Sequence, residues 1–174
     1  MKILQKLKYY ILIIRSIPIN IKYLPFNQAI KIPIFLTNSK FIGKGRIVIE
    51  SNEVYRGMIN LGAYLCPKYP RKGITIENNG CIVFKGACTI GNNSFISIGK
   101  RGTLIVGDNL VVNSSVNIIC ARKIVIGKNN LFGWETTIMD TSFHPLYDRE
   151  NHSFLPATAP SLSVIIIGLE CKLL

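Results

Sequence analysis

Aliphatic residues that recur every six positions are the most constraining feature of this 174-residue chain. One series of such residues is Val106, Val112, Ile118 and Ile124, and a second series, two residues out of phase, is Ile126, Phe132 and Ile138. A helix gives apolar steps of three and four, and a half-buried strand gives steps of two, so neither explains the period. Six residues describe one short strand and one corner, with a single side chain directed into a narrow core.

The residues between the aliphatic positions are those that corners require. Gly follows an aliphatic residue at several places, as in Ile90-Gly91 and Val106-Gly107, and Asn and Asp cluster next to these glycines. Gly, Asn and Asp tolerate the positive φ angles of tight corners. Three sides close a triangular coil of about 18 residues, and such coils stack through parallel strand pairing. Because Ile occurs 29 times and Ala only 6 times, we expect a mainly β fold. The pattern predicts a parallel β-helix over residues 41–174.

The repeat is interrupted at three places. Gly107 and Gly127 are 20 residues apart instead of 18, which predicts a bulge of two residues. Residues 64–73 do not fit the period and should form a loop. Residues 145–163, rich in Pro, Ser, Thr and charge, should form a longer loop that leaves the helix. The pattern returns at 163–168 and ends in an incomplete final coil.

Residues 1–40 form a separate, basic amphipathic segment. Apolar residues recur there at helical steps, at Leu4, Leu7, Ile11 and Ile14. This spacing predicts a short amphipathic helix over residues 2–16, which Pro18 should end because proline lacks an amide hydrogen. Two interpretations remain open: the helix packs on the end of the domain, or it lies on a membrane surface.

Positive charge is concentrated at the N-terminal end. The chain has 21 Lys and Arg against 9 Asp and Glu, and no acid precedes Glu50. Such a field attracts nucleic acid, an anionic membrane or a phosphorylated small molecule. Basic and aromatic residues do not interleave along the repeats, so a nucleic-acid partner is not expected. No apolar run is long enough to span a bilayer. We expect a cytoplasmic protein, with peripheral contact to an anionic membrane face through residues 1–24.

Cysteines and histidines give no metal signature. The five cysteines contain no C-x-x-C pair, which is typical of reduced thiols in a cytosolic protein. His144 and His152 are the only histidines, too few for a three-histidine zinc site. No metal cofactor is expected.

His144 is the strongest candidate for chemistry. It continues the series 126, 132, 138 at the point where the repeat gives way to the long loop, so it is well placed to face a groove. An imidazole titrates near pH 6.5 and suits proton abstraction from a hydroxyl group. A histidine that merely closes the edge of a coil is the alternative interpretation. His152 lies in a polar loop and should be solvated.

Residues 137–145, Thr-Ile-Met-Asp-Thr-Ser-Phe-His-Pro, resemble the D-x-x-x-H-P segment of the hexapeptide-repeat O-acetyltransferases. These left-handed parallel β-helix enzymes acetylate sugars and polysaccharide precursors, including capsule and O-antigen units. The resemblance covers residues 41–146, and residues 1–40 look like the basic leader of some capsule-cluster members. The resemblance implies acetyl-CoA as donor, a sugar or glycan precursor as acceptor, a homotrimer with active sites between subunits, and His144 as general base.

Three further residues are candidates for substrate binding. The resemblance suggests that Asn117 contacts the acceptor or the oxyanion, although an Asn at a β-helix corner explains it equally well. Asp140 either orients the imidazole or binds a sugar hydroxyl, or it is a turn residue. Trp134 either stacks on the apolar face of a sugar or packs at a corner.

The chain departs from the family at its C-terminal end. Family members continue for two or three further coils, which form much of the acetyl-CoA groove, whereas this sequence stops at Leu174. We therefore expect a shortened chain. An alternative function follows from this departure: a non-catalytic β-helix subunit or scaffold that has lost its CoA-binding coils.

Overall fold

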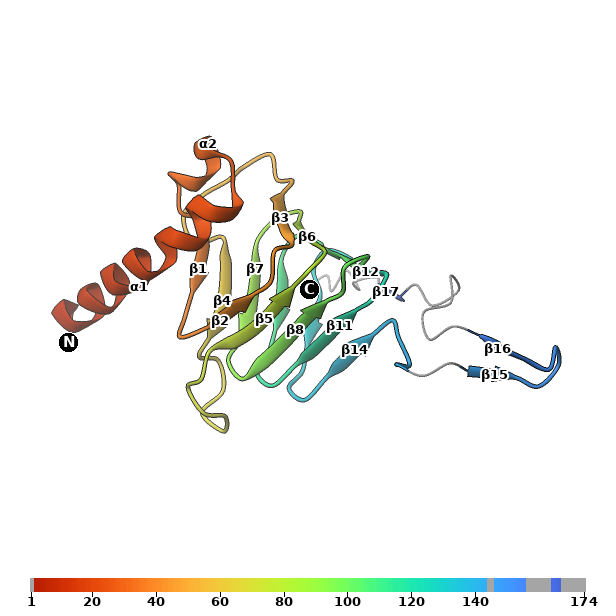
Figure 1. Ribbon diagram of the computed structural model, residues 1–174. Coiled ribbons are helices and arrows are strands. Elements are labelled where there is room, and N and C mark those ends of the chain that lie inside the picture. Colours follow the sequence, from red (N-terminus) through yellow and green to blue (C-terminus); the bar gives the residue numbers. More distant parts are fainter. Residues whose placement is uncertain (1, 144–145, 156–163, 167–174) are drawn as a thin grey trace, which may run out of the picture.

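The protein is a parallel β-solenoid preceded by a helix, as a computed structural model that describes residues 2–143, 146–155 and 164–166 shows (Figure 1). Its strands form three five-stranded sheets, in which every neighbouring pair is parallel. Sheet A contains β1 (Ile34–Leu36), β4 (Ile59–Ala63), β7 (Cys88–Gly91), β10 (Leu110–Val112) and β13 (Leu131–Phe132). Sheet B contains β2 (Lys40–Ile42), β5 (Ile74–Asn78), β8 (Ser94–Ile98), β11 (Asn117–Cys120) and β14 (Thr137–Met139). Sheet C contains β3 (Arg46–Ile49), β6 (Cys81–Phe84), β9 (Thr103–Val106), β12 (Lys123–Ile126) and β17 (Val164–Ile166).

The core is a set of aliphatic ladders inside the stack of coils. In sheet B, Ile76 pairs in register with Ile96, Ile96 with Ile118, and Ile118 with Ile138, and all four side chains are buried. The residues of the first six-step series, Val106, Val112, Ile118 and Ile124, are likewise buried. The mainly β parallel helix predicted from the period is therefore confirmed.

The expected coil of 18 residues with a single two-residue bulge is wrong. The register of sheet B pairs Ile96 with Ile118 and Ile118 with Ile138, so these two coils contain 22 and 20 residues. The additional residues lie in the corners, where asparagines adopt positive φ angles, at Asn93, Asn109 and Asn129. Two of them stack, because Asn109 Nδ2 donates a hydrogen bond of 3.0 Å to Asn129 Oδ1. The six-residue step thus describes the spacing of core residues within a coil, whereas the length of the corners decides how many residues the coil contains.

The described residues of both predicted loops lie outside the regular coils. Residues 64–73 connect β4 to β5, as the break in the period indicates. Between β14 and β17, the chain forms an antiparallel hairpin of β15 (Leu146–Asp148) and β16 (Ser153–Leu155), which projects from the solenoid in Figure 1. The predicted return of the repeat is β17, which pairs with β12. The incomplete final coil after Ile166 lies outside the described residues.

The N-terminal helix is longer than the sequence predicts. α1 extends over Lys2–Tyr23 with Pro18 inside it, and the short α2 (Phe26–Ala29) follows. The prediction that the helix ends at Pro18 is therefore wrong. An internal proline costs a helix about 3 kcal/mol. Contacts with β1 offset this cost, because they hold the turns on both sides of Pro18 against the solenoid.

These contacts close the free edge of β1, the outermost strand of sheet A. Asn20 Nδ2 donates to the carbonyl oxygen of Ile34 at 2.8 Å, and Asn20 Oδ1 accepts from the Ile34 amide at 3.0 Å. Ser16 Oγ accepts from the Leu36 amide at 3.0 Å. Ser16 and Asn20 are fully buried. An unpaired strand edge invites aggregation, and α1 removes this liability at β1.

We predict that Asn20→Ala lowers the free energy of unfolding by about 1–3 kcal/mol, because it leaves the amide and carbonyl of Ile34 buried without partners. Urea denaturation followed by circular dichroism measures this change. Asn52→Ala, at an exposed position, is the matched control and should change stability little. Equal stability of the two variants would contradict the capping role of Asn20.

Candidate functional site

Two of the predicted site residues lie at the corner between sheets A and B in the last coils, here called the A/B corner (residues 113–117 and 133–137). Asn117 is the first residue of β11, and its amide donates to the carbonyl oxygen of Thr136 at 2.9 Å. Its side-chain Nδ2 donates to Thr137 Oγ1 at 3.3 Å. Because Ile118 points into the core, the side chain of Asn117 faces outward. Trp134 lies in the turn between β13 and β14 with 55% of its surface exposed.

The loop of residues 64–73 reaches the A/B corner from the second coil. Tyr69 Oη donates to Glu135 Oε1 at 2.7 Å, and Lys68 Nζ lies 3.2 Å from the same oxygen. The hydrogen bond from Tyr69 and the charge of Lys68 lower the pKa of Glu135, and the contact with Glu135 raises the pKa of Lys68. Burial, followed by the contact with Glu135, raises the pKa of Tyr69. The loop is thus held against the turn that joins β13 to β14.

A buried asparagine, Asn92 between β7 and β8, anchors the same loop on the third coil. Asn92 Oδ1 accepts from Ser114 Oγ at 2.6 Å and from the Leu65 amide at 3.3 Å. Its Nδ2 donates to the carbonyl oxygen of Pro70 at 2.9 Å. Hydrogen bonds near both of its ends and to Glu135 therefore fix the loop along the A/B corner.

Asp140 lies at the opposite end of β14 and is fully buried. Its carboxylate accepts hydrogen bonds from three successive amides, of Ala121 at 2.6 Å, Arg122 at 2.8 Å and Lys123 at 2.6 Å. The Cys120 thiol lies 3.7 Å from Oδ2. Both carboxylate oxygens are engaged by the turn that joins β11 to β12. Of the interpretations given above, this geometry favours the turn residue.

Asn117 and Trp134 thus both lie at the A/B corner, whereas Asp140 lies at the other end of β14. His144 itself lies outside the described residues. The chain before it is described as far as Phe143, which is exposed and has a φ of 60°. His152 is exposed near the tip of the β15–β16 hairpin, with Nδ1 3.3 Å from Tyr147 Oη.

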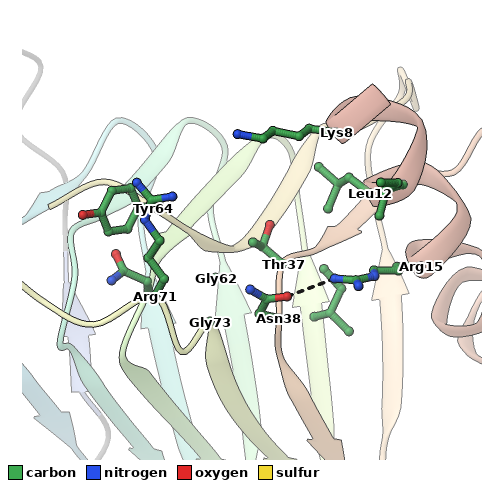
Figure 2. A pocket seen from close by; sticks show the side chains of 12 residues that line it. Lys8, Leu12, Arg15, Thr37, Asn38, Gly62, Tyr64, Arg71 and Gly73 are labelled. Atoms are coloured by element: carbon green, nitrogen blue, oxygen red, sulfur yellow. Dashed lines mark hydrogen bonds between the residues drawn. The ribbon is translucent and has the colours of Figure 1, made fainter. Parts of the chain in front are cut away.

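A cavity beside α1 was not foreseen from the sequence. It has a volume of about 340 Å³ and lies between α1, the end of β1 and the 64–73 loop (Figure 2). Arg15 Nη1 donates to Asn38 Oδ1 at 3.1 Å on one side, and the Arg71 guanidinium lies 4.1 Å from the ring centroid of Tyr64 on the other. Lys8 reaches across the cavity from α1 in Figure 2. A sequence signal did exist, since the cavity residues Lys8 and Arg15 are seven residues apart in the predicted helix and therefore lie on one face of it.

Comparison of the chain with protein-family models, with curated proteins and with solved structures finds no match. The parallel β-solenoid is therefore established by the chain's own strand pairing.

We predict that Asp140→Asn lowers the free energy of unfolding by about 1.5–3 kcal/mol. In the variant an amide nitrogen replaces one acceptor oxygen, and the side chain no longer carries the negative charge that strengthens these hydrogen bonds. Thermal unfolding measures the loss. Glu53→Gln removes a charge at an exposed position and is the matched control. A variant as stable as the control would show that the turn does not need the carboxylate.

We predict that Cys88 and Cys120 resist thiol reagents at pH 8 in the folded protein. Burial raises the pKa of both thiols, that of Cys120 to about 12 with a further contribution from the charge of Asp140. Thiolate is the reactive form, so both should be labelled only after unfolding. The folded state holds these protons more tightly, so their contribution to stability should be lost as pH rises from about 9 toward 12. Mass mapping of labelled peptides tests this, and native labelling of Cys120 would contradict it.

Proposed function

We propose that the protein is an O-acetyltransferase that transfers an acetyl group from acetyl-CoA to a hydroxyl group of a sugar or polysaccharide precursor. The observation that carries the proposal is the D-x-x-x-H-P segment, Asp140 to Pro145, at the point where the chain leaves a parallel β-solenoid. The resemblance of this segment to the hexapeptide-repeat enzymes supplies the reaction class, and the solenoid is the architecture that such enzymes use.

His144 is the general base of the proposed reaction. Its neutral imidazole takes the proton from the acceptor hydroxyl while the hydroxyl oxygen attacks the thioester carbonyl carbon. The C–S bond then breaks, and the proton held by the imidazolium goes to the departing thiolate of coenzyme A. The products are the acetyl ester and free coenzyme A, and His144 returns to its neutral form.

Three described residues have supporting roles in this proposal. Asn117 offers an outward amide at the A/B corner, suited to the acceptor or the oxyanion, and the exposed ring of Trp134 offers a face for a sugar. Asp140 is a positioning residue: by holding the 121–123 turn, it fixes the end of β14 from which residues 141–143 leave the solenoid.

The proposal extends to assembly and donor binding. The family resemblance favours a homotrimer with a left-handed helix and with active sites between neighbouring subunits. The basic excess of the chain supports binding of the phosphates of coenzyme A.

We predict that His144→Ala lowers the rate of acetyl transfer by about 10²–10⁴-fold, because it removes a positioned base. The rate is measured as release of free coenzyme A thiol from acetyl-CoA over a panel of sugar acceptors. His152→Ala is the matched control, since His152 is exposed on the hairpin, and it should retain activity.

Two outcomes would overturn the proposal in different ways. Equal rates in wild type and His144→Ala would remove His144 from the mechanism. Absence of turnover, together with absence of coenzyme A binding by calorimetry and a trimer by light scattering, would identify the alternative, a non-catalytic β-helix subunit.

A further inference from the structure

α1 carries an apolar stripe that the solenoid leaves uncovered. Its members alternate in steps of four and three along the whole helix, and they are Ile3, Leu7, Tyr10, Ile14, Ile17 and Ile21. Each is exposed, from 36% for Ile17 to 85% for Ile3. In Figure 1, the N-terminal half of α1 projects beyond the first coil. An apolar stripe of this length on the surface marks an interaction site.

The stripe cannot turn inward, because α1 uses a different face to cap the solenoid. Ser16 and Asn20 hold that face against β1 through the hydrogen bonds described above, and Ile19 is buried beside them. At 100° per residue, the three capping residues lie about 100–160° from the centre of the stripe. What covers the stripe must therefore come from outside this coil stack.

Basic residues lie on both sides of the stripe. Lys8, Arg15 and Lys22, here called the basic row, recur every seven residues on one side of α1, about 100–140° from the centre of the stripe, and Lys6 lies about 60° from the centre on the other side. No acidic residue occurs in α1 or anywhere before Glu50. A second copy of the chain docked through α1 would bring these cations together without compensating carboxylates on the helix. An anionic surface neutralises them, and long basic side chains reach such a surface while their stems cover apolar groups.

The cavity shown in Figure 2 opens beside the basic row and shares Lys8, Ile11 and Arg15 with α1. Arg71 and Tyr64 face these residues from the 64–73 loop, and none of the described residues that line the cavity is acidic. Guanidinium groups recognise phosphate oxygens well. The cavity is thus suited to a lipid phosphate when the stripe rests on a bilayer.

We propose that α1 docks the protein on an anionic phospholipid surface, with the stripe in the interfacial region and a lipid phosphate in the cavity between the basic row and Arg71. None of the helices among residues 2–143 is long and apolar enough to cross a membrane, which agrees with a helix lying in the plane of the surface.

The test is sedimentation of the full chain with vesicles of phosphatidylcholine alone and of phosphatidylcholine with phosphatidylglycerol. We expect binding to the anionic vesicles only, weakened when salt rises from about 0.1 to about 0.5 M. Leu7→Ser with Ile14→Ser should lower the affinity at least about tenfold, as should Lys8→Gln with Arg15→Gln and Lys22→Gln. Arg71→Gln should lower it by a smaller factor if the cavity holds a lipid phosphate.

The matched control variants remove the same kinds of side chain from surfaces of the solenoid that lie outside α1. Val111→Ser with Leu131→Ser removes exposed apolar groups of sheet A, and Lys100→Gln with Arg101→Gln and Lys123→Gln removes three exposed charges from corners of the solenoid. Both should bind vesicles like wild type. Circular dichroism verifies that each variant folds.

Three results would overturn the proposal. The first is equal binding of the wild type to neutral and anionic vesicles, and the second is unchanged vesicle binding by the stripe variant, Leu7→Ser with Ile14→Ser. The third is a wild type that does not bind vesicles but self-associates, with a self-association that the stripe variant abolishes. The last result would assign the stripe to a second copy of the chain. If millimolar glycerol phosphate displaced the protein from vesicles, and if the stripe variant bound vesicles as tightly as wild type, the cavity would take a soluble phosphate instead. Acetyl transfer is measured without vesicles, so the proposed activity and the docking can fail independently.

Discussion

Stacking of aliphatic side chains inside a narrow triangular coil is the interaction on which the rest of this structure depends. Each side of a coil contributes a short strand, and residues such as Ile96, Ile118 and Ile138 rest on one another in register. Parallel pairing then repeats the same inside-outside alternation in every coil. The arrangement has a physical consequence at its ends: the outermost strand has a free backbone edge and an open apolar interior.

α1 resolves this problem at β1, the outermost strand of sheet A. Ser16 and Asn20 pair with the backbone of β1, so a helix supplies the hydrogen bonds that another strand would have supplied. The helix must then turn a defined face toward the solenoid. Its apolar stripe consequently points away, and the same contact that stabilises the fold creates the surface that we propose for membrane docking.

The corners of the solenoid divide structural and functional roles in a comparable way. Asp140 is directed inward, and its carboxylate is engaged by three amides of the neighbouring turn. Asn117 and Trp134 are directed outward at the other end of β14, where the anchored 64–73 loop lies beside them. A rigid corner with exposed polar and aromatic groups is a suitable place for a site, because the stacked coils beneath it fix its position.

The sequence by itself determined the inside and outside of the coils, the two interruptions at 64–73 and 145–163, and the position of Asn117 next to a core isoleucine. These features depend on local periodicity, which a single strand and corner already express. Only the tertiary structure decided that α1 continues through Pro18, that the coils contain 20 and 22 residues, and that Asp140 is buried. The partners that decide these features, such as Ile34 for Asn20 and Ala121 for Asp140, are 14 and 19 residues away in sequence and become neighbours only when the coils stack.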